Sequence, residues 1–203
     1  MSSRSQKNKK PLFLIAVFVL LTLIILFLGN TIYEIAREKY LLSAYPIKYE
    51  ELVEKYAAEN KVDKFLIYAI IKTESDFRSD AESNLGARGL MQIMKTTFEW
   101  VRYRLDDSDD LAFDTMYDSE QNIRYGSYLI AYLIDHFGSV ELAVCAYHAG
   151  IGNVESWLKD PEYSSNGTKL DVIPISDTEY YLEKVTNALN IYHNLYTEEN
   201  QND

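Results

Sequence analysis

The sequence predicts an all-α protein in which one compact, globular helical domain follows a single membrane-spanning helix. Residues 12–32 form an uncharged, apolar run that matches the ~20 residues needed to cross a bilayer. Further along, apolar residues recur at helical spacing, without strand-period alternation of useful length. A length of 203 residues accommodates this anchor and one domain that buries a core without disulfides.

The run 12–32 is interpreted as a transmembrane anchor. A cleaved signal peptide is the alternative, but its apolar core is usually only ~7–15 residues long, and no small-x-small cleavage motif follows Leu28. The tail 1–11 is basic, so the positive-inside rule predicts that it lies in the cytoplasm. We therefore expect a single-pass protein of the cell membrane, with the domain outside the cytoplasm.

Residues 33–47 carry several charges and include Pro46, which predicts a juxtamembrane helix or stalk. The domain is expected over 48–196, and a flexible tail over 197–203. The domain's first helix is indicated by apolar residues at helical spacing: Tyr49, Leu52, Val53, Tyr56 and Ala57.

Asp63 is expected to cap the second helix, whose residues 65–71 are apolar on nearly every side. Such a helix belongs in the centre of a domain. Thr96 and Glu99 form a capping box that predicts the start of a third helix, and the acidic segment 106–110 ends it.

Asp118 with Gln121 predicts the start of the next helix, and Gly138 predicts its end. We expect this helix to be the longest in the domain. Ser139 opens a short apolar helix that reaches Ala149, after which Gly150 and Gly152 are expected to break the chain.

A further turn or two is expected over 153–158, and a last helix follows a loop of about 18 residues. Its apolar face consists of Tyr181, Leu182, Val185, Leu189 and Tyr192. The helical pattern is interrupted at 79–94 and 150–176, which predicts two long loops in an otherwise helical domain.

Composition excludes several classes of function. All 31 acidic residues follow residue 30, so the domain lacks the basic face that nucleic-acid binding needs. Cys145 is the single cysteine and lies in an apolar run, which predicts a buried, inert thiol. The three histidines (His136, His148, His193) lack the paired spacing of zinc ligands, so neither a metal nor a cofactor is expected.

Glu74 is the strongest catalytic candidate, because it ends the most apolar helix. Burial and the negative end of a helix dipole both disfavour its charged form, which raises the pKa. A carboxylic acid that stays protonated can donate its proton to a departing glycosidic oxygen. A solvated helix terminus is the alternative for a glutamate at such a position.

Two other segments carry residues suited to a cleft. Gly86 and Gly89 permit a turn with positive φ, and Gln92 follows within an apolar stretch where its amide needs partners. Tyr147 precedes small residues and a chain break, which suits a cleft wall, although a core aromatic with a hydrated hydroxyl is the alternative.

Together these segments resemble the lytic transglycosylase family with the goose-type lysozyme fold. The match covers roughly residues 50–195 and consists of Glu74–Ser75, Gly89–Met94, Ala146–Gly150 and Ile173–Pro174, followed by Asp177 and Tyr181. The resemblance implies that Glu74 is the catalytic acid and base. It also implies that Ser83, Gln92, Met94 and Tyr147 line the cleft for N-acetylated sugars, with Asp177 and Tyr181 behind it.

The sequence departs from the family pattern at three positions. Lys95 stands where the family usually has proline, His148 stands where it usually has asparagine, and Asp177 stands where it usually has glutamate. Lys95 is expected to loosen a turn. His148 is expected to alter contacts near the substrate, since an imidazole differs from an amide in shape and titrates near neutral pH.

The resemblance implies cleavage between N-acetylmuramic acid and N-acetylglucosamine in peptidoglycan, with the muramic 6-hydroxyl closing onto its own anomeric carbon. A lone catalytic glutamate fits this route, because hydrolytic glycosidases normally use two carboxylates. A hydrolytic lysozyme and a non-catalytic wall-binding scaffold are the alternatives. Expected partners are the glycan strands and, through residues 12–32, the lipid bilayer. A membrane-anchored enzyme that cuts glycan strands could also work with a cell-wall or secretion machinery.

Overall fold

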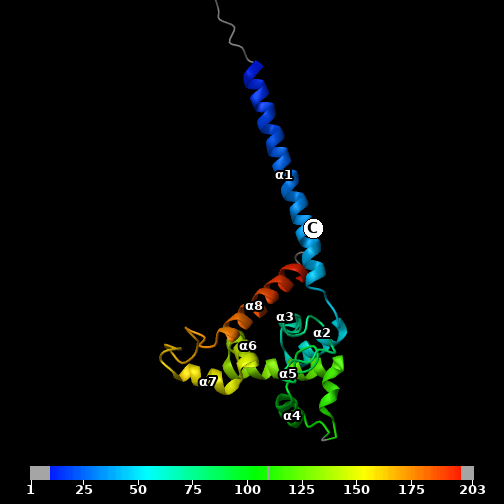
Figure 1. Cartoon of the computed structure of the whole chain (residues 1–203), viewed down its shortest axis with the longest axis vertical. Coiled ribbons are helices and arrows are strands. Elements are labelled where there is room, and N and C mark those ends of the chain that lie inside the picture. The colour runs from blue at the N-terminus through cyan, green and yellow to red at the C-terminus, as the bar shows by residue number, and fades with distance from the viewer. Residues whose placement is uncertain (1–9, 109, 198–203) are drawn as a thin grey trace, which may run out of the picture. The chain divides into compact units, whose positions relative to one another are not determined.

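The computed structural model describes residues 10–108 and 110–197, and the chain divides into two compact units between Ala44 and Tyr45. Throughout the described residues the regular elements are helices, and extended backbone pairs only in two isolated bridges (Figure 1). The all-α prediction is therefore confirmed.

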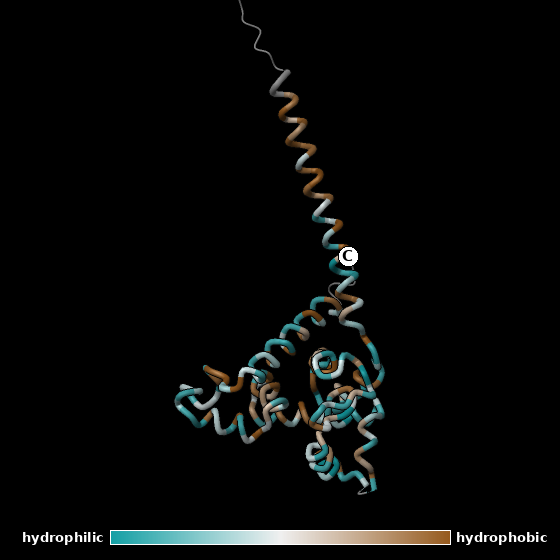
Figure 2. Tube along the Cα trace, in the orientation of Figure 1, coloured by the Kyte–Doolittle hydropathy of each residue, from teal (hydrophilic) through white to brown (hydrophobic). Residues whose placement is uncertain are grey.

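The first unit is a single helix, α1 (Lys10–Ala44), of 35 residues. Its apolar side chains from Phe13 to Ile32 are exposed, and Figure 2 shows this hydrophobic stretch along the helix. By length and composition, α1 is the one helix among the described residues that is able to cross a membrane. The helix continues without a break through the charged residues 33–44.

The second unit holds the remaining helices. They are α2 (Glu50–Asn60), α3 (Lys64–Glu74), α4 (Lys95–Arg104), the 3₁₀ helix η1 (Phe113–Tyr117), α5 (Ser119–Phe137), α6 (Val140–Ala149), α7 (Ile151–Lys159) and α8 (Ser176–Tyr196). Helix α8 packs along α3 and α6, whereas α5 packs against α2, α4 and α6. Tyr45 and Ile47 also lie against the core of this unit.

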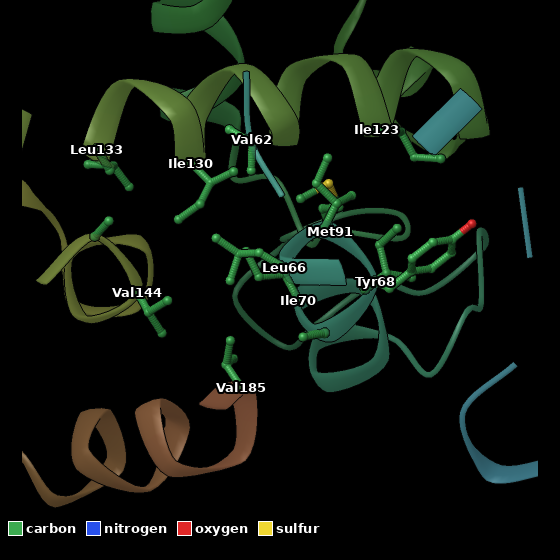
Figure 3. Close-up of a cluster of buried hydrophobic side chains, with 14 of the residues drawn as sticks. Val62, Leu66, Tyr68, Ile70, Met91, Ile123, Ile130, Leu133, Val144 and Val185 are labelled. Atoms are coloured by element: carbon green, nitrogen blue, oxygen red, sulfur yellow. The ribbon is translucent and has the colours of Figure 1, made fainter. Parts of the chain in front are cut away.

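Helix α3 occupies the centre of the unit, as its sequence predicts. Asp63 caps it by accepting a 2.9 Å hydrogen bond from the Phe65 amide, and residues 65–71 are all buried. Figure 3 shows Leu66 and Ile70 of α3 among Ile130 of α5, Val144 of α6 and Val185 of α8. Surrounding helices on every side explain why α3 lacks a polar face.

The predicted ends of α5 and the start of α6 are confirmed. Asp118 accepts a hydrogen bond of 2.9 Å from the Gln121 amide, and Gly138 adopts the left-handed conformation with φ 65°. Ser139 then caps α6 by accepting a bond from the Leu142 amide. These signals are local in the chain, so the sequence alone is enough to identify them.

Three helix predictions are wrong. Helix α4 begins at Lys95, not after Thr96, because the Met94 carbonyl already accepts from the Phe98 amide at 2.8 Å. Helix α8 has 21 residues and exceeds the 19 of α5. Gly152 does not break the chain: it lies inside α7, and the break is made by Gly150 with φ 90°.

Candidate active site

The loop between α3 and α4 is built by backbone pairing and by one buried hydroxyl. Arg88 forms isolated bridges with Glu82 and Ile93, which fold residues 82–93 back on themselves. At the end of α3, the Ser75 hydroxyl is buried and donates a 2.8 Å bond to the Leu90 carbonyl. The loop is thereby tied to the helix end that carries Glu74.

Asn122 of α5 holds the same loop from the other side, a role the sequence analysis missed. Its Nδ2 donates to the carbonyls of Arg88 and Met116 at 2.8 Å, and its Oδ1 accepts from the Met91 amide at 2.7 Å. The residue is 0% exposed. A polar side chain beside Ile123 on the apolar face of α5 was the signal that could have identified it, since buried amides need partners.

Gly89 allows this close approach. Its φ is +77°, and a Cβ at this position would lie 2.1 Å from the Met116 carbonyl oxygen and 2.3 Å from Asn122 Nδ2. A residue without a side chain is therefore required where the loop meets α5.

Glu74 is the last residue of α3 and is mostly enclosed by protein. Burial raises the pKa of its carboxyl to about 7, against the opposing effects of a hydrogen bond from Tyr181 and the positive charge of Lys184. The Tyr181 hydroxyl donates to Oε1 over 2.7 Å. A carboxyl with a pKa near neutrality can both give and take a proton at working pH.

Tyr181 is itself held in place by His148. The two rings are stacked, with centroids 4.6 Å apart and an interplanar angle of 24°. His148 Nδ1 lies 3.1 Å from the hydroxyl of Thr178, which is 1% exposed and was not singled out from the sequence. Burial lowers the pKa of His148, and the nearby charge of Asp177 raises it.

Tyr147 interacts electrostatically with the same carboxyl. Burial, and then the charge of Glu74, raise the pKa of Tyr147 well above its usual value. Its hydroxyl donates a 2.7 Å bond to the Met91 carbonyl, so α6 also anchors the loop that precedes α4. The structure thus gathers Glu74, Tyr147, His148 and Tyr181 from three helices.

Ser83 and Gln92 use their polar atoms within the loop. The Ser83 hydroxyl accepts from the amides of Leu85 and Ala87, which closes a turn. Gln92 adopts φ 49°, and its Nε2 donates to the carbonyls of Ala81 and Gly89. Both side chains shape the loop, and the positive φ of Gln92 marks backbone strain of the kind that gathers at functional sites.

Met94 and Asp177 are less closely tied to Glu74. Met94 is 38% exposed and lines a separate hollow of about 460 Å³ with Lys95, Arg88 and Asp114. Asp177 is exposed in the first turn of α8, and its charge acts on His148.

An apolar pocket of about 260 Å³ adjoins this group of residues. Ala146 and Tyr147 line one part of it, and Trp100 and Thr96 of α4 line another. The pocket therefore shares Tyr147 with the surroundings of Glu74.

Potential metal ligands and the single cysteine are the other reactive groups within residues 10–108 and 110–197. In that part of the chain no three histidine, cysteine, aspartate or glutamate side chains gather closely enough to hold a metal ion. Cys145 is 1% exposed, and burial raises the pKa of its thiol to about 11. The predicted buried cysteine is confirmed, and a high pKa disfavours the nucleophilic thiolate.

The amino-acid sequence also matches a known protein family directly. Residues 51–168, more than half of the chain, match the family model described as Transglycosylase SLT domain. The chain belongs to this family. The resemblance to lytic transglycosylases predicted from the sequence is confirmed.

Named members of the SLT family match the same region. Soluble lytic murein transglycosylase of Escherichia coli (strain K12) is 28% identical over 148 residues, which are 72% of this chain and 23% of that protein. Membrane-bound lytic murein transglycosylase C of Yersinia pestis (strain Pestoides F) is 33% identical over 116 residues, 53% of this chain and 32% of that protein. The chain thus spans about a quarter to a third of these relatives.

A solved SLT structure supports the fold. The X-ray structure of an inactive glutamate-to-glutamine mutant of lytic transglycosylase Slt from Pseudomonas aeruginosa superposes with a TM-score of 0.65 at 27% identity, covering 75% of this chain and 25% of that one. The predicted lysozyme-like fold is confirmed for this SLT domain.

Proposed function

We propose that the second unit is a peptidoglycan lytic transglycosylase with Glu74 as general acid and base. The observation that carries this proposal is the partly buried carboxyl of Glu74, whose pKa is about 7 and whose Oε1 accepts a bond from Tyr181. Near neutral pH this carboxyl exists in both protonation states, which a single acid/base residue needs in one catalytic cycle.

The reaction needs no second carboxylate. Protonated Glu74 donates its proton to the oxygen that links the muramic anomeric carbon to the next sugar, and that carbon–oxygen bond breaks. The muramic 6-hydroxyl oxygen then bonds to the anomeric carbon, and its proton passes to the Glu74 carboxylate. Bonds and protons balance without water, and Glu74 returns to its starting state.

The remaining site residues are assigned to substrate contact or support. Tyr147 forms a cleft wall beside Glu74, while Ser83, Gln92 and Met94 contribute from the loop before α4. Because Nε2 of Gln92 is engaged by loop carbonyls, Oε1 is its atom for accepting a bond from a sugar hydroxyl or amide. His148 and Asp177 flank Tyr181, which contacts the carboxyl itself.

Relatives lend independent support. Those described above are named lytic murein transglycosylases, and one structure carries an inactivating glutamate-to-glutamine change. Transferring that chemistry to the present chain is part of the proposal, because the match spans only a minor share of each relative.

The decisive experiment compares wild-type protein with Glu74→Gln on purified peptidoglycan. We expect Glu74→Gln to lose cleavage, because an amide cannot donate and retrieve the proton, a role worth ~10²–10⁴-fold in rate. Glu99→Gln is the matched control, since Glu99 is an exposed glutamate on α4. Mass spectrometry should find products one water lighter than hydrolysed fragments. Near-normal cleavage by Glu74→Gln would refute the catalytic assignment. Wild-type products that carry free reducing ends, without the loss of one water, would identify a hydrolytic lysozyme instead.

The proposed location follows from α1. Residues 12–32 are assigned as the membrane span, with the basic tail 1–11 in the cytoplasm and the SLT unit outside. An impermeant thiol reagent tests this in intact cells. Tyr103, 83% exposed, is replaced by cysteine, while native Cys145 stays unreactive at 1% exposure. Labelling of Tyr103→Cys only after cell lysis would contradict the topology.

A further inference from the structure

Helix α1 continues beyond the stretch that a bilayer would cover. The proposed span ends at residue 32, yet the helix runs on for about three more turns to Ala44, and Figure 2 shows hydrophilic residues along this later part. On these turns Ile35 and Leu42 are 51% and 41% exposed. Lipid does not explain apolar side chains outside the span, and a few helical turns without packing are only marginally stable in water. These turns therefore favour a packing partner.

The apolar residues of α1 follow a seven-residue repeat. With Ile32 at position a of a repeat lettered abcdefg, positions a and d between residues 21 and 42 are apolar except at Lys39. They are Leu21, Ile25, Leu28, Ile32, Ile35 and Leu42. An apolar a/d repeat kept over three heptads is the sequence pattern of a coiled coil, and isoleucine at a with leucine at d favours two strands.

The turns after the span distinguish the a/d side of the helix from the opposite side. Glu34 and Arg37, at positions c and f, point away from the a/d side and form an ion pair with each other, with 3.6 Å between Oε2 and Nη1. Tyr33 and Tyr40, both at b, also lie away from it, where their hydroxyls can meet water. The exposed aliphatic residues at d thus form a separate stripe.

Charges beside this stripe fit a second copy of the same helix. Lys39 occupies an a position, and Glu38 occupies the g position just before it. In the part of the chain that the structure describes, neither side chain forms an ion pair. In a parallel pair of helices a side chain at a lies beside the g residue of the other helix, so each Lys39 would meet Glu38 of the partner subunit. A single lysine at an a position also fixes the register of such a pair.

We propose that α1 forms a parallel two-stranded coiled coil with α1 of a second copy of this chain, extending from the span to Leu42. Copies that insert with the same topology present their helices in the same direction, which is the direction that the pairing of Lys39 with Glu38 requires. The dimer carries two SLT units on one paired anchor. This inference rests on the proposed membrane span.

Cysteine cross-linking of the full-length protein in isolated membranes tests the pairing. Ile35→Cys and Leu42→Cys place thiols at d, where the two copies face each other within reach of a disulfide. Glu34→Cys and Arg37→Cys are the matched controls, because they place thiols on the opposite side of the same turns. After mild oxidation the d variants should give at least about fivefold more covalent dimer than the controls. Wild-type protein should give none, because its single cysteine is buried.

Charge exchange tests the register of the two helices. Lys39→Glu and Glu38→Lys each bring like charges together, and each should lower the dimer-to-monomer ratio in detergent about threefold. The double variant restores opposite charges and should return the ratio to the wild-type value. Sedimentation velocity measures the ratio, and a double variant no better than the two single variants would contradict the pairing of Lys39 with Glu38.

The outcomes separate this inference from the proposed function. Equal cross-linking at all four positions, or none at any of them, would overturn the coiled coil, whereas cleavage of peptidoglycan by wild-type protein would still uphold the enzyme. A mature protein that lacks residues 1–32 by intact mass would overturn the proposed anchor and the pairing together.

Discussion

The Tyr181 hydroxyl donates a 2.7 Å hydrogen bond to Oε1 of Glu74, joining residues that are 107 positions apart in the chain. This bond favours the charged carboxylate, whereas burial favours the neutral acid, and burial has the larger effect on the pKa of Glu74. The balance between the two leaves the carboxyl near its midpoint at neutral pH. Substitutions of the residues around this carboxyl should therefore change the pH dependence of activity or stability.

Tyr181→Phe should raise the pKa of Glu74, because the variant removes a bond to the carboxylate and leaves the burial unchanged. Since the proposed reaction starts from protonated Glu74, the alkaline limb of the kcat/KM profile should move to higher pH by about one unit. The measurement is a pH profile of cleavage of solubilised peptidoglycan. A limb that stays in place, or moves toward acid, would contradict the role of this bond.

His148→Ala should shift the same limb in the same direction but by less. We propose that His148 is a positioning residue, because its ring stacks on Tyr181 at 4.6 Å and its removal should let the phenol move away from Glu74. His148→Phe keeps an aromatic ring and should preserve the wild-type profile. The sharper test is a double-mutant cycle, in which His148→Ala should add no shift when Phe already replaces Tyr181. Additive shifts would mean that His148 acts independently of Tyr181.

Glu74→Gln should stabilise the fold at neutral and alkaline pH. The native pKa of about 7 lies above the unfolded value of 4.5, so the native state binds more protons and loses stability as pH rises between these values. Above pH 7 the cost of the buried charge reaches its full value, up to about 3 kcal/mol at ~1.4 kcal/mol per pKa unit. Thermal melts should therefore show a gap between variant and wild type that widens from pH 4.5 to pH 7. A gap independent of pH would argue against a perturbed Glu74.

Gly89→Ala should destabilise the protein by about 3 kcal/mol or more, because the new Cβ adds a clash with Met116 and Asn122 to the strain of positive φ. Gly86→Ala isolates the strain, since Gly86 has φ +80° but no atom within 4 Å of its Cβ position. It should cost only about 1–2 kcal/mol. Urea unfolding measures both, and equal losses would remove the argument for close contact between the loop and α5.

Much of the helical framework could be predicted from local signals. Asp63, Asp118 and Ser139 each accept a hydrogen bond from an amide two or three residues away. Such bonds depend on neighbours in the chain, so their residue types are visible in the sequence. The start of α4 was misplaced for a related reason: Thr96 has the residue type of a cap, but the backbone had already turned helical at Lys95.

The sequence by itself determined the long apolar helix near the N-terminus, the all-α class, the buried helix that ends at Glu74 and the family motifs. Only the tertiary structure decided that Tyr181 bonds Glu74, that His148 stacks on Tyr181, and that Asn122 clamps the loop that carries Gln92. Periodicity and capping act over a few residues, whereas these contacts join segments brought together by packing. The partial burial that raises the pKa of Glu74 arises in the same way, because residues from several helices must pack around one carboxyl.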